Sequence, residues 1–166
     1  MVNELTFEII QRCLNNCIYC SSNSNNKSQY ITDFNTFKNV IDDAVELGLK
    51  RLCISGGEPF LHPDILNIVL YAKLKNIEVF IYSCGVVENN GSLQDETLES
   101  LANLNLDKII FNLQASKMEL FDYITGTHDR FDLVKNSIYQ ASKLGIYTEV
   151  HFVPMKLNYN EIEPTL

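Results

Sequence analysis

The chain has 166 residues, of which 46% are apolar and 20% charged, and its formal charge is −8. This length allows one domain with a hydrophobic core, and the composition is typical of a soluble globular protein. The negative charge and the lack of a basic tract argue against non-specific nucleic-acid binding, because nothing would neutralise the phosphates. A peptide, a nucleoside or another small substrate stays compatible with this composition.

The sequence carries no targeting signal that we can identify. The first residues are neither basic nor followed by a long apolar stretch, and no apolar run reaches the roughly 18 residues of a membrane helix. Five cysteines are present, three of them within eight residues, a layout that argues against disulfides. We therefore expect a protein of the reducing cytoplasm without a membrane span.

Strand and helix patterns alternate along the chain. Strands are predicted at 4–10, 49–55, 77–83, 108–113 and 146–153, and helices from 34 to Gly48, after Pro63, and at 95–104, 117–123 and 131–144. Loops rich in polar residues are predicted at 21–29 and 88–92. Strands separated by helices imply parallel pairing with right-handed crossovers. The fold class is therefore α/β, a partial (βα) barrel of parallel strands that stops before a sixth βα unit.

Three cysteines on one short loop are the strongest chemical signal. Cys13, Cys17 and Cys20 follow the first predicted strand at spacings of three and two intervening residues. Thiolates are soft ligands that suit iron–sulfur or zinc sites. No fourth cysteine or histidine lies nearby, so a cubane cluster held here would keep one iron free for a small molecule. A structural zinc site and unrelated thiols are the alternatives.

Other candidate residues follow the ends of the predicted strands. Reactive groups of βα barrels gather at the carboxyl ends of the strands. The candidates at the ends of the predicted strands are the cysteine loop, Gly56 to Pro59, Ser83 and Cys84, Asn112 to Gln114, and Val153. Two adjacent glycines permit a close backbone approach to a ligand. The neighbouring carboxylate of Glu58 suits a ligand that carries an ammonium group.

The Cys-x3-Cys-x2-Cys spacing, with Tyr19 just before the last cysteine, resembles the cluster loop of the radical S-adenosylmethionine (SAM) enzymes. The Ser55-Gly56-Gly57-Glu58-Pro59 run is similar to a second motif of that family, and the resemblance extends from about residue 5 to residue 155. The family normally has six βα units. The resemblance therefore implies that residues 1–166 are an incomplete radical SAM core domain, either a fragment or a short form completed by a partner chain.

The resemblance also implies cofactors and ligand residues. A [4Fe–4S] cluster would be held by the three cysteines, and SAM would chelate the open iron. The residues that match SAM-binding positions of the family are Tyr19, Gly56, Gly57, Glu58, Pro59, Ser83, Asn112, Gln114 and Val153. Two departures stand out: Cys84 replaces a common asparagine, and no arginine occupies the usual place for the SAM carboxylate, for which Arg130 or Lys117 could substitute.

The resemblance implies an enzyme that reductively cleaves SAM to a 5′-deoxyadenosyl radical and modifies a peptide, a protein or a cofactor precursor. A peptide, protein or small-molecule substrate and a reductant such as flavodoxin or ferredoxin are the expected partners, and the sequence identifies no catalytic residue. The alternative is a non-catalytic iron–sulfur protein for electron transfer or sensing. Cys53 and Cys84 are expected to pack structurally, and His151 is a weaker candidate for ligand contact.

Overall fold

The sheet of the computed structural model, which describes residues 1–87 and 91–165, has the predicted α/β organisation. Five strands pair in the order β1-β2-β3-β6-β7, and every pairing is parallel. Their bounds are Glu4–Ile10 for β1, Arg51–Gly56 for β2, Glu78–Ser83 for β3, Lys108–Asn112 for β6 and Thr148–His151 for β7. Strands β1 and β7 are the two edges, so the described residues form an open, partial barrel.

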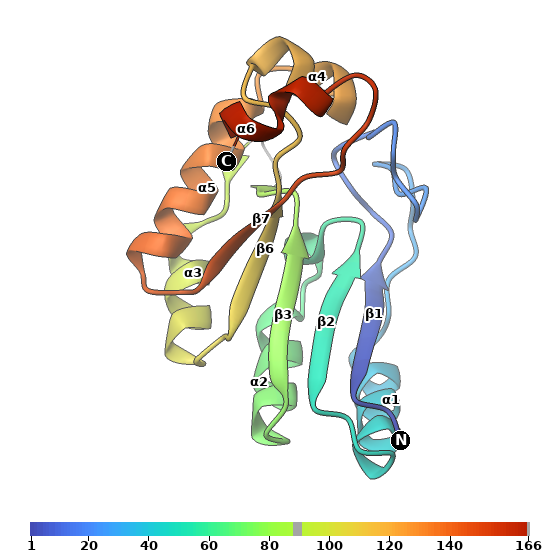
Figure 1. Ribbon diagram of the computed structural model, residues 1–166. Helices are drawn as coiled ribbons and strands as arrows, with labels where there is room; N and C mark the ends of the chain where they lie inside the picture. The colour runs from blue at the N-terminus through green and yellow to red at the C-terminus, as the bar shows by residue number, and fades with distance from the viewer. Residues whose placement is uncertain (88–90, 166) are drawn as a thin grey trace.

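The long helices all lie on one face of the sheet, as Figure 1 shows. They are α1 (Phe34–Glu46), α2 (Ile65–Leu74), α3 (Asp95–Asn103) and α5 (Phe131–Lys143). The shorter α4 (Met118–Thr125) and α6 (Ile162–Thr165) lie beyond the carboxyl ends of the strands, and η1 (Pro59–Leu61) and η3 (Tyr159–Glu161) are single 3-10 turns. In the ranges that the structure describes, we find no helix with the length and apolar character needed to cross a bilayer.

Strand alternation separates a dry face from a polar one. Leu52 and Ile54 of β2 point toward the helices and are fully buried, as are Val79 and Ile81 of β3. Helix α1 completes this layer because the Asp33 carboxylate accepts hydrogen bonds from two backbone N–H groups of the first turn, which fixes the start of the helix. The hydrophobic core therefore lies between the sheet and the four long helices.

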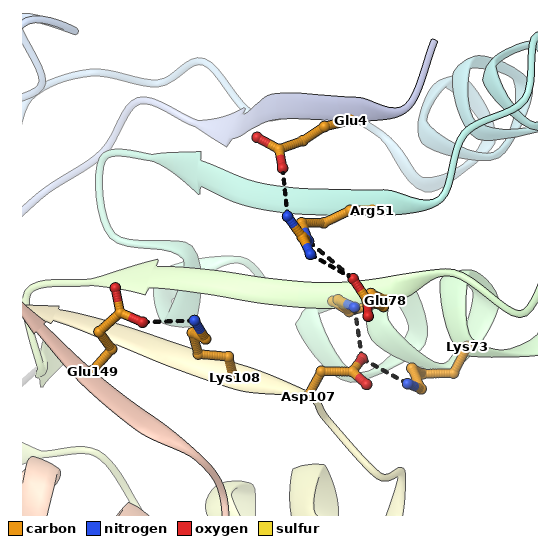
Figure 2. Close-up of polar contacts among 8 residues, drawn as sticks. Glu4, Arg51, Lys73, Glu78, Asp107, Lys108 and Glu149 are labelled. Carbon is orange, nitrogen blue, oxygen red and sulfur yellow. Dashed lines mark hydrogen bonds and ion pairs between the residues drawn. The ribbon is translucent and has the colours of Figure 1, made fainter. Parts of the chain in front are cut away.

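The opposite face of the sheet carries paired charges, which Figure 2 shows. The guanidinium of Arg51 lies 3.0 Å from the carboxylate of Glu4 and 2.9 Å from that of Glu78, so one cation joins three neighbouring strands. The ammonium of Lys108 lies 2.6 Å from the carboxylate of Glu149 on the next strand. No helix of the described residues packs on this face, which corresponds to the inside of a barrel.

Two predicted elements differ from the structure. A long fifth strand was expected over 146–153, but β7 spans only Thr148–His151. Beyond it, the backbone N–H of Val153 donates to the side chain of Gln114 at 2.7 Å instead of to a neighbouring strand. In the polar loop predicted at 88–92, residues 91–92 form strand β5, which pairs antiparallel with β4 at 86–87. Residues 88–90 of that prediction lie outside the described residues.

Candidate functional site

One cavity of about 310 Å³ opens at the carboxyl ends of the strands, and most of the predicted site residues line it. The predicted residues on its wall are Cys13, Cys17, Tyr19, Cys20, Gly56, Gly57, Ser83, Asn112 and Val153. The predicted residues that do not line it are Glu58, Pro59, Gln114 and His151. The structure therefore brings the cysteine loop and the glycine turn together, although β1 and β2 are separated in sequence by helix α1.

The cysteine loop is anchored on the far side by helix α4 and the turn after it. The backbone N–H groups of Asn16 and Ile18 donate to carbonyls of the last α4 residues, at 2.9 and 3.0 Å. The guanidinium of Arg130 donates to the carbonyl of Leu14 at 2.8 Å and to the side-chain oxygen of Asn15 at 2.9 Å. Arg130, a candidate for the SAM carboxylate, thus holds the loop that carries the cysteines.

Glycine is required at positions 56 and 57 because the backbone before Cys13 passes too close for a Cβ. A Cβ at Gly57 would lie 2.1 Å from the carbonyl oxygen of Arg12, and one at Gly56 would lie 2.1 Å from that of Ile10. The backbone N–H of Gly57 donates to the Ile10 carbonyl at 2.6 Å, and that of Glu58 donates to the Arg12 carbonyl at 2.9 Å. The close approach predicted for a ligand therefore serves the segment that leads into Cys13 as well.

The carboxylate of Glu58 lies behind the wall of the cavity. It is fully buried and accepts hydrogen bonds from the Ser83 hydroxyl at 3.0 Å, the Cys84 backbone N–H at 2.7 Å and the Phe60 backbone N–H at 3.1 Å. Burial raises the pKa of Glu58. This carboxylate ties the glycine turn to the end of β3, and its contact with a ligand ammonium stays a prediction.

Gln114 and Tyr19 support the same site from two sides. The Gln114 side chain is fully buried and accepts from the backbone N–H of Val153, which places Val153 on the cavity wall. The hydroxyl of Tyr19 contacts Cys17 and Gln114, and burial raises the pKa of Tyr19, so the phenol keeps its proton. Both side chains therefore act in the site as neutral packing and hydrogen-bonding groups.

The three cysteines of the loop and Cys84 share the cavity as free thiols. The thiol of Cys84 faces that of Cys13, and hydrogen bonding between them lowers the pKa of Cys13. Burial raises the pKa of Cys17 to about 11. Because cluster ligands are thiolates, binding of a cluster here would release protons.

The donor set of the cavity, three thiols of one loop, fits a [4Fe–4S] cluster. A [4Fe–4S] cluster takes one thiolate per iron, so its ligands stand apart around a volume such as this cavity. The backbone N–H of Ser24 also donates to the Cys20 sulfur at 3.4 Å, a contact typical of cluster ligands.

His62, His151 and Cys53 do not line the cavity, although the ring of His151 packs against that of Tyr82 on its wall. His62 is buried, and its ring accepts from the Asp64 backbone N–H at 3.0 Å just before α2, so it has a structural role there. His151 pairs with Glu149 at 2.8 Å on the polar face of the sheet. Cys53 is buried within β2, as expected.

Sequence reasoning missed several cavity residues. They are Asn15, Ser21, Ser22, Ser24, Tyr82 and Thr125. Ser55 was named only as part of the glycine motif, and Cys84 was named at the end of its strand with packing as the favoured role. Asn15 lies inside the cysteine loop and Tyr82 directly precedes Ser83, so their sequence positions could have indicated them. Thr125 gave no such signal, because it reaches the site through the docking of α4 on the cysteine loop.

Comparison with known proteins agrees with this geometry. The sequence profile of the Radical SAM superfamily matches residues 7–166. A protein of Methanococcus aeolicus named "Probable GTP 3′,8-cyclase" is 29% identical over 163 residues, which cover 95% of this chain and 50% of that protein. A GTP 3′,8-cyclase of Desulforamulus reducens is 30% identical over 161 residues, which cover 95% of this chain and 46% of that protein. The chain spans about half the length of these curated relatives.

A solved structure shares the fold. SuiB of Streptococcus suis bound to S-adenosylmethionine superposes with a TM-score of 0.83 at 19% identity, over 99% of this chain and 37% of SuiB. SuiB has also been solved with its precursor peptide SuiA, with a TM-score of 0.83 at 20% identity, over 98% of this chain and 35% of SuiB.

The cysteine loop, the glycine turn and the parallel half-barrel thus define a radical SAM core. The chain belongs to the Radical SAM superfamily. Membership implies a [4Fe–4S] cluster and SAM as cofactors, in agreement with the donor set of the cavity.

Proposed function

We propose that residues 1–166 are one radical SAM core domain that binds a [4Fe–4S] cluster and SAM in the cavity at the strand ends. The single observation that carries this proposal is the meeting of three free thiols and the Gly56-Gly57 turn on one cavity wall. When bound, the cluster would supply the electron that cleaves SAM to methionine and a 5′-deoxyadenosyl radical.

The residues of the chain divide this task. Cys13, Cys17 and Cys20 hold the cluster and leave one iron without a protein ligand. The glycine turn and the other residues assigned to SAM would hold it in the same cavity. The positions we assign to SAM are Tyr19, Gly56, Gly57, Glu58, Pro59, Ser83, Asn112, Gln114 and Val153. Of these, Glu58, Pro59 and Gln114 do not line the cavity, so we assign them to holding the wall against which SAM rests.

We further propose that the substrate is a peptide, a protein or a cofactor precursor that reaches the cavity from the polar face of the sheet. The SuiB structure with a precursor peptide supports a peptide, and the relatives named GTP 3′,8-cyclase support a small, polar precursor. The polar face suits a polar substrate of either kind, because it presents partly exposed charged side chains. Flavodoxin or ferredoxin would supply the electron in the cytoplasm, and a partner chain or further residues would complete the barrel.

The test is anaerobic reconstitution with iron and sulfide, followed by reduction, addition of SAM and assay for 5′-deoxyadenosine. We expect 5′-deoxyadenosine from the wild type and none from Cys20→Ala. Cys53→Ala is the matched control, because it removes a buried thiol outside the cavity and should keep the activity. A reduced, fully loaded wild type that yields no 5′-deoxyadenosine refutes the proposal.

The non-catalytic alternative is separated by EPR spectroscopy. If SAM binds the open iron, it should change the EPR spectrum of the reduced cluster. An unchanged spectrum would instead favour an electron-transfer or sensing protein.

A further inference from the structure

Ser24 has a hydroxyl group for which the described residues offer no partner. The side chain is 5% exposed, and its Oγ is buried without a hydrogen bond among the residues that the structure describes. Ser24 also lines the cavity that holds the cysteines. Buried hydroxyls are nearly always hydrogen-bonded, so an orphaned one on a cavity wall points to a group bound in that cavity.

Other serines in the same loop differ from Ser24 in this respect. The hydroxyl of Ser22 donates to a carboxylate oxygen of Glu8, and that of Ser28 donates to the side-chain oxygen of Gln11 at 3.4 Å. The hydroxyls of Ser22 and Ser28 are therefore satisfied by side chains of β1 and the residue after it. Ser21, Ser22 and Ser24 all line the cavity, and among them Ser24 is the one whose hydroxyl is buried without a partner in the described residues.

The loop also fixes where Ser24 stands. The backbone N–H of Cys13 donates to the carbonyl of Asn25 at 3.2 Å, and Arg12 forms a parallel bridge with Asn25, so the loop folds back over the cysteines. The backbone N–H of Ser24 donates to the Cys20 sulfur at 3.4 Å. Ser24 is thus held by contacts of its loop with the segment before Cys13 and with Cys20, and its hydroxyl is the polar group of this residue that keeps no partner among the described residues.

We propose that Ser24 is a cluster-binding residue whose hydroxyl donates a hydrogen bond to a sulfur atom of the [4Fe–4S] cluster at its Cys20 corner. This inference rests on the proposed function, because it takes the cluster as the occupant. The cluster is favoured over another ligand because the N–H of the same residue already points at a sulfur that would hold it. Ser24 would then supply two adjacent donors to one corner of the cluster.

Two donors at one corner have a consequence for redox chemistry. A reduced cluster carries one more negative charge than an oxidised one, so hydrogen bonds to its sulfurs favour the reduced state and raise the reduction potential. Removal of the Ser24 hydroxyl should therefore make the cluster harder to reduce, while the backbone N–H and the three thiolates stay in place.

The experiment is an EPR-monitored redox titration of the reconstituted cluster, without substrate and without turnover. Ser24→Ala should lower the ratio of reduced to oxidised cluster at a fixed potential by about twofold to tenfold, where tenfold corresponds to about 59 mV for one electron. Ser24→Thr keeps a hydroxyl and should stay near the wild-type potential. Ser28→Ala is the control, because Ser28 lies in the same loop and has a partner outside the cavity.

A wild-type potential in Ser24→Ala overturns the inference, and so does an equal shift in Ser28→Ala. If Ser24→Ala does not take up the cluster, Ser24→Val and Ser24→Thr are compared instead, since they match in size and differ in the hydroxyl; equal potentials then overturn it. The titration needs no SAM cleavage. A chain that cleaves SAM with a potential independent of Ser24 loses only this inference, whereas a chain that never binds a cluster refutes the proposed function.

Discussion

Gly57→Ala should displace the segment that leads into the cysteines. A Cβ at this position would lie 2.1 Å from the carbonyl oxygen and 2.5 Å from the carbonyl carbon of Arg12, and both are backbone atoms. The oxygen contact must open to at least 3.0 Å, and no flexible side chain can absorb that movement. Forcing an extra carbon into a packed site costs about 1–3 kcal/mol, a large part of the roughly 5–15 kcal/mol that stabilises a domain.

Two measurements check this prediction. Urea unfolding of the metal-free chain should show the loss of stability, and the iron content after reconstitution should fall because Cys13 moves with Arg12. Gly145→Ala is the matched control: Gly145 has a φ of +79° but no neighbour within 4 Å, so its cost of about 1 kcal/mol comes from backbone strain alone. A Gly57→Ala protein as stable as this control, with full iron content, would refute the reasoning.

Three further predictions concern charged groups. Because burial raises the pKa of Glu58, protonation favours the folded chain, so the unfolding free energy should fall as pH rises through that pKa. Glu58→Gln should remove this pH dependence in urea titrations, and a variant with the same pH profile as the wild type would contradict it. Arg130→Ala should speed hydrogen exchange at Asn16 and Ile18 about tenfold, since charge-assisted bonds to the loop are lost; unchanged protection would contradict it. Arg51→Ala should cost at most about 1 kcal/mol and less in high salt, because its ion pairs are partly exposed; a cost of about 3 kcal/mol would show that the pairs are desolvated.

The sequence predicted the layers of the fold because hydrophobic periodicity determines them. Apolar residues in β2 and β3 and along one side of the helices meet in one core, so the α/β class and the parallel order follow from local patterns. The cysteines and the glycine turn were also predicted to meet, because the carboxyl ends of parallel strands lie at one edge of the sheet.

Side-chain direction at those strand ends was not predictable in the same way. The sequence suggested a ligand ammonium for Glu58 but did not indicate the three donors of the chain that surround its carboxylate, two of them at the end of β3. The segment 21–29 was predicted only as a polar loop, and its composition did not indicate that it folds back to bond Cys13 and bury Ser24. Both results depend on contacts between residues far apart in sequence, which composition does not encode.

Neighbouring residues of one strand lie on opposite faces of the sheet, so one is constrained by core packing and the next only by contacts on the polar face. Leu52 faces the helical layer, where a change of volume disturbs packed neighbours, whereas Arg51 faces the open side, where a change alters two partly exposed ion pairs and a contact with the Phe80 ring. Substitutions can therefore accumulate on the open side while the helical side and the cavity at the strand ends keep their shape. A scaffold of this kind can change its substrate without losing its fold, because alternate residues of the same strands face the open side and the hydrophobic core.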